Sequence, residues 1–122
     1  MKPRLPTILL IEKDEITLEL YQRELNRSFK VIAVTELDGV MEMLASQDIQ
    51  VVIIEPEICG GQGWDLIDLI HKALPSRPIP VIVCSTRDEG PQLNGMAVAR
   101  YLTKPVLPRT LRDEIVEVLK KY

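Results

Sequence analysis

Residues 51–57 of this chain read Val51-Val52-Ile53-Ile54-Glu55-Pro56-Glu57. Four consecutive β-branched apolar residues end abruptly on a carboxylate, and so short a run is typical of a strand buried on both faces of a parallel sheet. Pro56 cannot donate a hydrogen bond to a neighbouring strand, so the strand should end near Glu55. We therefore expect Glu55 at the carboxyl end of a central strand, facing the crevice where open α/β sheets bind ligands.

Further short apolar runs on either side predict the remaining strands, at 7–11, 29–34, 79–84 and 100–103. Between them, apolar residues three and four positions apart predict helices. These helices are expected over 16–26, from an N-cap at Asp38 to Ser46, over 64–73, and from Pro108 onward. The first has two apolar faces, one with Leu18, Tyr21 and Leu25 and one with Ile16 and Leu20. The glycine-rich segment 59–63 is expected to be a loop.

Five alternations of strand and helix indicate one domain over residues 1–122. The expected fold is a three-layer, doubly wound, five-stranded parallel sheet of (βα)5 type with right-handed crossovers. Segment 88–97 fits this pattern least well, because it contains Gly90, Pro91, Asn94 and Gly95, which disfavour a regular helix. We expect a short or distorted fourth helix there, or a loop.

Composition excludes several classes of function. The net charge of -3 across 122 residues gives no basic surface for nucleic acid. No apolar run approaches the roughly 20 residues of a membrane span, and no signal-peptide core follows Met1, so we expect a cytoplasmic protein with neither nucleic acid nor membrane as partner. Cys59 and Cys84 do not make a disulfide framework.

Polar side chains follow the strands, and the carboxyl ends of parallel strands meet at one edge of the sheet. Carboxylates that meet there raise each other's pKa unless cations lie between them, and two lysines are available. The expected set is Glu12, Lys13 and Asp14 after the first strand, Glu55 after the third, Ser85 after the fourth and Lys104 after the fifth.

At this point the chain resembles the receiver domain of two-component response regulators, a flavodoxin-like fold, over essentially its whole length. The resemblance is carried by residues 8–14, by Ile54-Glu55 with Gly63 downstream, by residues 80–85, and by residues 101–105 followed by Pro108. It implies a phosphoryl-accepting residue at the Glu55 position, assisted by magnesium on an acidic pair after the first strand. It also implies a lysine at Lys104, often before a cis proline, a hydroxyl at Ser85 and a switch aromatic at Tyr101.

The match departs from this family at two positions. Glu55 stands where the family has its acceptor aspartate, and Lys13 stands at the main metal ligand. A lysine there removes an oxygen ligand and adds positive charge, so magnesium binding should be lost or weak and no other cofactor is expected. Lys13 could instead place its ammonium where the ion would lie, and Glu55 could reach toward Lys104.

The resemblance therefore implies a degenerate pseudo-receiver, not an enzyme and without catalytic residues, that acts through protein–protein interaction. Its partners would be a sensor kinase or an effector, with a possible homodimer through the last strand and last helix. One alternative is a working phosphoacceptor receiver that uses Glu55 or Asp14. Another is a flavodoxin-like small-molecule binder, although no phosphate-cradling glycine pattern follows the first strand.

Overall fold

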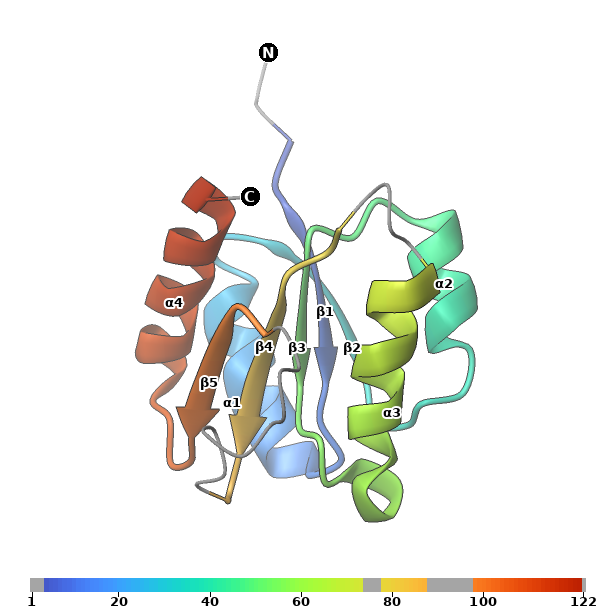
Figure 1. Ribbon diagram of the computed structural model, residues 1–122. Coiled ribbons are helices and arrows are strands. Elements are labelled where there is room, and N and C mark those ends of the chain that lie inside the picture. The colour runs from blue at the N-terminus through green and yellow to red at the C-terminus, as the bar shows by residue number, and fades with distance from the viewer. Residues whose placement is uncertain (1–3, 74–77, 88–97, 122) are drawn as a thin grey trace.

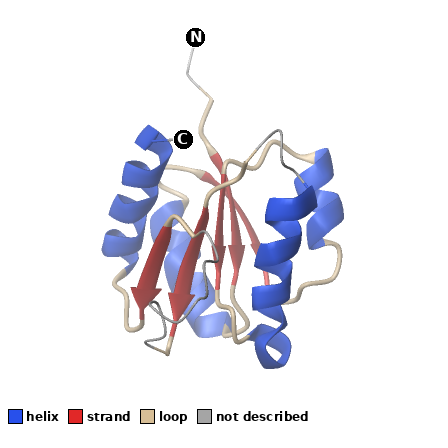
Figure 2. Cartoon of the chain, viewed as in Figure 1, coloured by secondary structure: helices blue, strands red, loops and turns tan. Residues whose placement is uncertain are grey.

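A five-stranded sheet forms the middle layer of the computed structural model. The structure describes residues 4–73, 78–87 and 98–121, except for the side chain of Cys59. All neighbouring strands are parallel, and their order is β2-β1-β3-β4-β5 (Figure 2). This confirms the expected sheet. The strands are β1 (Thr7–Ile11), β2 (Lys30–Val34), β3 (Val51–Ile54), β4 (Val81–Ser85) and β5 (Arg100–Thr103).

Helices cover both faces of the sheet and complete the three layers. They are α1 (Glu15–Leu25), α2 (Val40–Ser46), α3 (Ile58–Ala73) and α4 (Pro108–Lys121). Figure 1 shows α1 and α4 on one face and α2 and α3 on the other. The expected short or distorted fourth helix at 88–97 lies outside the described residues. In the described part of the chain, no helix is long and apolar enough to cross a membrane.

The core has two halves because successive side chains of a strand point to opposite faces of the sheet. In β3, Val52 and Ile54 pack toward α2 and α3, whereas Val51 and Ile53 pack toward α1 and α4. All four are fully buried, as a central strand covered on both faces requires. The helices contribute Val40, Leu44, Leu66, Ile67 and Ile70 to the first half and Tyr21, Leu25, Leu111, Ile115 and Val118 to the second.

The prediction of a loop over 59–63 was wrong, because α3 already begins at Ile58. Its first turn is unusual: Gly60 and Gly61 have φ of 69° and 95°, values that side chains other than glycine rarely adopt. Gly63 is required for a different reason. A Cβ there would lie 2.7 Å from Cα of Pro56, so α3 approaches the end of β3 too closely for any side chain.

The structure decides which apolar face of α1 is buried and corrects the predicted N-cap of α2. Ile16 and Leu20 are 72% and 51% exposed, because α1 buries the neighbouring stripe that contains Tyr21 and Leu25. The N-cap of α2 is Gly39 rather than Asp38, and it has a φ of 77° and no side-chain hydrogen bond. The chain thus enters α2 through a left-handed glycine instead of a carboxylate cap.

Candidate functional site

The predicted site residues meet where the strands end. The hydrogen-bond ladder continues one residue past the strands, because the backbone N–H of Glu55 donates to the carbonyl of Ile11 (3.0 Å) and that of Lys104 to the carbonyl of Ser85 (2.6 Å). These bonds fix the residues at the sheet edge in register. Glu12, Glu55 and Ser85 are 3%, 4% and 0% exposed, so the edge carries two carboxylates removed from water.

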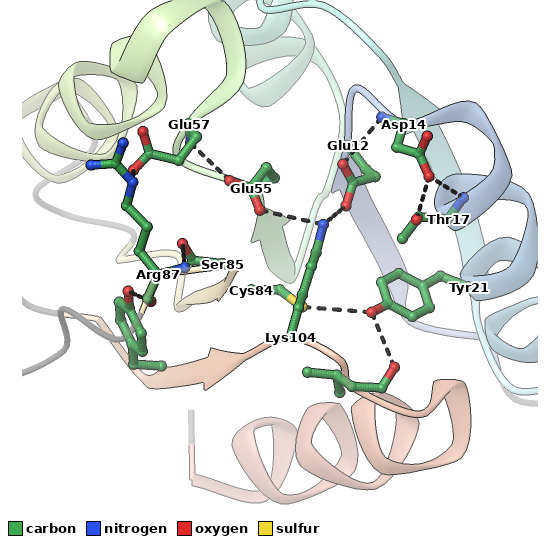
Figure 3. Close-up of polar contacts among 12 residues, drawn as sticks. Glu12, Asp14, Thr17, Tyr21, Glu55, Glu57, Cys84, Ser85, Arg87 and Lys104 are labelled. Carbon is green, nitrogen blue, oxygen red and sulfur yellow. Dashed lines mark hydrogen bonds and ion pairs between the residues drawn. The ribbon is translucent and has the colours of Figure 1, made fainter.

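Lys104 is the cation between these carboxylates (Figure 3). Its Nζ forms an ion pair with Oε1 of Glu12 and lies 3.3 Å from Oε2 of Glu55. Burial lowers the pKa of Lys104, but the hydrogen bond to Glu12 and the charges of Glu12 and Glu55 outweigh it, so the pKa is raised. Lys104 therefore stays protonated. Its bond to Pro105 is cis, as the resemblance implied.

The two oxygens of Glu55 have different partners. Oε1 accepts a hydrogen bond from the backbone N–H of Glu57 at 3.0 Å. Oε2 faces Lys104 and has no aligned hydrogen bond from a described residue. The ion pair with Lys104 is therefore the main compensation for burying this oxygen, since a buried charge without a partner is very costly.

Asp14 belongs to the start of α1 rather than to the carboxylate pair. Its carboxylate accepts hydrogen bonds from the backbone N–H (2.9 Å) and the hydroxyl of Thr17, which makes it the N-cap. The Thr17 hydroxyl and backbone N–H lower the pKa of Asp14. The backbone N–H of Asp14 in turn donates to Oε2 of Glu12 at 3.2 Å, so the cap and the pocket are connected.

Lys13 does not take the place that we expected. It is exposed and forms no ion pair with any residue in the described ranges, so it is not the counter-ion of Glu55. It precedes the N-cap of α1, where the chain turns at the surface. Lys104 neutralises the carboxylates instead, because its side chain crosses the end of β4 to reach β3 and β1.

Ser85 and Tyr101 both contact the backbone of Arg87. The N–H of Arg87 donates to Oγ of Ser85 at 3.0 Å, and the hydroxyl of Tyr101 donates to the carbonyl of Arg87. Nε of Arg87 also lies 3.8 Å from Oε1 of Glu57. Sequence reasoning missed the roles of Arg87 and Glu57. The available signal was their position: Glu57 lies three residues past the end of β3 and Arg87 two residues past the end of the adjacent β4, with opposite charge.

Tyr21 and Cys84 are a second pair that sequence reasoning did not place in the site. The hydroxyl of Tyr21 donates to the carbonyl of Val106 at 3.1 Å and lies 3.8 Å from Sγ of Cys84. Burial raises the pKa of both side chains. The charges of Glu12 and Glu55 add to this increase, so the pair borders the ion-paired carboxylates and stays neutral.

A doubly wound parallel sheet with acidic, hydroxyl and lysine side chains at the ends of its strands defines a receiver-type signalling domain. The chain belongs to the response regulator receiver domain family, whose sequence profile matches residues 8–116. It is therefore a receiver domain of two-component signalling, and receiver domains are signalling modules. The predicted family and fold class are confirmed.

Relatives of known name or structure agree with this assignment. The chain is 24% identical to the phosphate regulon transcriptional regulatory protein PhoB of Klebsiella pneumoniae over 93% of its length and 52% of the relative. It is 21% identical to the hydrogenase transcriptional regulatory protein HoxA of Cupriavidus necator, over 98% of the chain and 25% of the relative. It thus spans about a quarter to a half of these relatives. A CheY-like receiver domain from Methanospirillum hungatei has a TM-score of 0.84 at 20% identity, covering 96% and 95% of the two chains.

The residues present do not fit the magnesium ion of the family in this arrangement. Glu12 binds Lys104 through one oxygen and the backbone of Asp14 through the other, while the Asp14 carboxylate binds Thr17. Magnesium requires an octahedral set of oxygens. Within residues 4–73, 78–87 and 98–121, no three acidic, histidine or cysteine side chains are grouped to hold a metal ion.

Proposed function

We propose that this receiver domain works without phosphorylation, as a protein-interaction module in two-component signalling. The observation that supports the proposal is the ammonium of Lys104, which already pairs with Glu12 and Glu55. Phosphoryl transfer depends on positioning and on neutralising charge on the moving group. Here the cation that would do so already neutralises two carboxylates of the chain itself.

The chemistry of the acceptor position supports the same proposal. Glu55 is one methylene longer than aspartate, and its carboxylate is 4% exposed and held between Lys104 and the backbone of Glu57. Attack on an incoming phosphoryl group would require one oxygen to leave these contacts. Lys13, at the position of the main metal ligand, offers no oxygen. We therefore propose that magnesium binding is lost or weak.

We further propose that the partners are signalling proteins, such as a kinase or an effector, or a second copy of the chain that binds through β5 and α4. Support for a fixed surface at β5 and α4 comes from Arg100, whose Nε lies 3.0 Å from Oε2 of Glu114. Both side chains are 31% exposed. This pair fastens the last strand to the last helix, so the face remains in one shape.

The proposal is tested by incubating the chain with acetyl phosphate or a histidine kinase and measuring covalent label. We expect none, and we expect calorimetry to detect no magnesium binding at millimolar concentration. Lys13→Asp with Glu55→Asp should recover some magnesium binding, and each single variant less, because metal ligand and acceptor act as a unit. A stoichiometric, hydroxylamine-sensitive label on the wild type would instead support a phosphoacceptor receiver.

A further inference from the structure

Glu57 and Arg87 form a clasp outside the ion-paired carboxylates. Glu57 follows β3, Arg87 follows β4, and their side chains meet at 3.8 Å between Oε1 and Nε (Figure 3). The backbone N–H of Glu57 also binds the carboxylate of Glu55. The clasp therefore connects the buried acceptor position to the segment that follows β4.

The backbone of Arg87 is the point where this connection reaches the switch residues. Its N–H donates to the hydroxyl oxygen of Ser85, and its carbonyl accepts from the hydroxyl of Tyr101. A peptide backbone held at both its N–H and its carbonyl has little freedom to rotate. The hydroxyl of Tyr101 thus has a fixed acceptor only while the Arg87 backbone keeps this orientation.

We propose that Arg87 is a positioning residue that couples Glu55 to the orientation of Tyr101 through its contact with Glu57. The inference rests on the proposed function, because it explains how a receiver without phosphorylation keeps its switch aromatic in one state. The connection runs from Glu55 through Glu57 and Arg87 to Tyr101: the first contact lies within the segment after β3, and the other two join the ends of neighbouring strands. It does not pass through Lys104.

The expected effect is one of orientation and not of stability. The side chains of Arg87 and Glu57 are 61% and 24% exposed, and exposed ion pairs contribute little to the free energy of folding. Removing the guanidinium should therefore leave the unfolding midpoint almost unchanged. The hydrogen bond from the N–H of Arg87 to Ser85 would remain, but the segment would lose its side-chain contact with Glu57, and the carbonyl that accepts from Tyr101 would be held less firmly. A residue with a merely structural role would not produce this combination.

The test is NMR of the chain labelled with ¹³C-tyrosine, in wild type, Arg87→Ala, Glu57→Gln and the charge-swapped double variant Glu57→Arg/Arg87→Glu. Tyr101→Phe assigns the signals, and Tyr21 is an internal control. We expect one ring conformer of Tyr101 in the wild type and averaged or split Tyr101 signals in both single variants. The charge swap should restore the single conformer. Arg23→Ala removes an exposed pair with Glu19 and should change nothing.

Unchanged Tyr101 signals in Arg87→Ala would overturn the inference, and so would a charge swap that fails to restore them. Neither result bears on the absence of phosphoryl label in the wild type. Conversely, a labelled wild type would refute the proposed function while the Tyr101 signals still report on Arg87. The two ideas can therefore fail separately.

Discussion

Nζ of Lys104 lies 3.3 Å from Oε2 of Glu55, although the strands that carry them, β5 and β3, are separated by β4. The same ammonium pairs with Glu12 after β1. One side chain thus binds the ends of two strands that its own strand does not touch. A fixed positive charge therefore lies between the buried carboxylates at the sheet edge, whereas Lys13, next to Glu12 in sequence, lies at the surface.

Replacing Lys104 with methionine should destabilise the domain by about 3–5 kcal/mol, since removing one partner of a buried ion pair leaves the other charge uncompensated. The Lys104 side chain is 15% exposed and both glutamates are 4% exposed, so solvent cannot take over its role. Urea unfolding at neutral pH measures the difference. Lys13→Met, which removes the neighbouring exposed lysine, is the matched control and should stay within about 0.5 kcal/mol of the wild type.

The contribution of Lys104 should disappear at alkaline pH. Its pKa is raised above 10.5 in the folded chain, so its stabilisation is complete below that value and is lost as the pH rises through the folded pKa. Lys104→Met should therefore show a smaller loss of stability than the wild type as the pH rises above about 10.5. If the free energies of unfolding of the two chains decreased in parallel with pH, Lys104 would not be the stabilising cation. Tyr21 also loses its stabilising effect as the pH rises, because burial raises its pKa in the folded chain. Wild type and Lys104→Met are therefore both compared in a Tyr21→Phe background.

Gly63→Ala should destabilise the domain by about 1–3 kcal/mol, the usual cost of overfilling a packed contact. The new Cβ would lie 2.7 Å from Cα and 2.8 Å from the carbonyl oxygen of Pro56, which are backbone atoms that cannot rotate away. Gln62→Ala is the control, because Gln62 is the exposed neighbour in the same helix. If chemical denaturation finds the two variants equally stable, then α3 is free to move away from β3.

The residues at the strand ends could be predicted from sequence, but the pairing among them could not. Apolar runs that stop on Glu12, Glu55, Ser85 and Lys104 place these residues at one edge, because parallel strands share their carboxyl side. Which cation enters the pocket depends on side-chain paths several bonds long, and two lysines were available. Neighbourhood in sequence favoured Lys13, whereas the helix that starts at once after it turns that side chain outward.

The start of α3 and the inner face of α1 are a second case that the sequence alone could not predict. Gly60 and Gly61 indicate a loop by composition, yet the hydrogen bonds of α3 begin before them. Ile16 and Leu20 are as apolar as the buried Leu25, so periodicity alone predicted two stripes on α1. Which stripe is buried is decided by packing against α4 and the sheet, and this depends on residues far away in sequence.

The cation in this pocket is part of the polypeptide. Because the lysine is covalently attached, the fold sets its effective concentration at Glu12 and Glu55, as a linker does for a tethered ligand. This concentration does not depend on the amount of any free ion or metabolite. Chelators, dilution or changes in energy status cannot remove it. Under the function that we propose, a partner of this domain would respond to the number of its copies in the cell, and control would pass to synthesis and degradation.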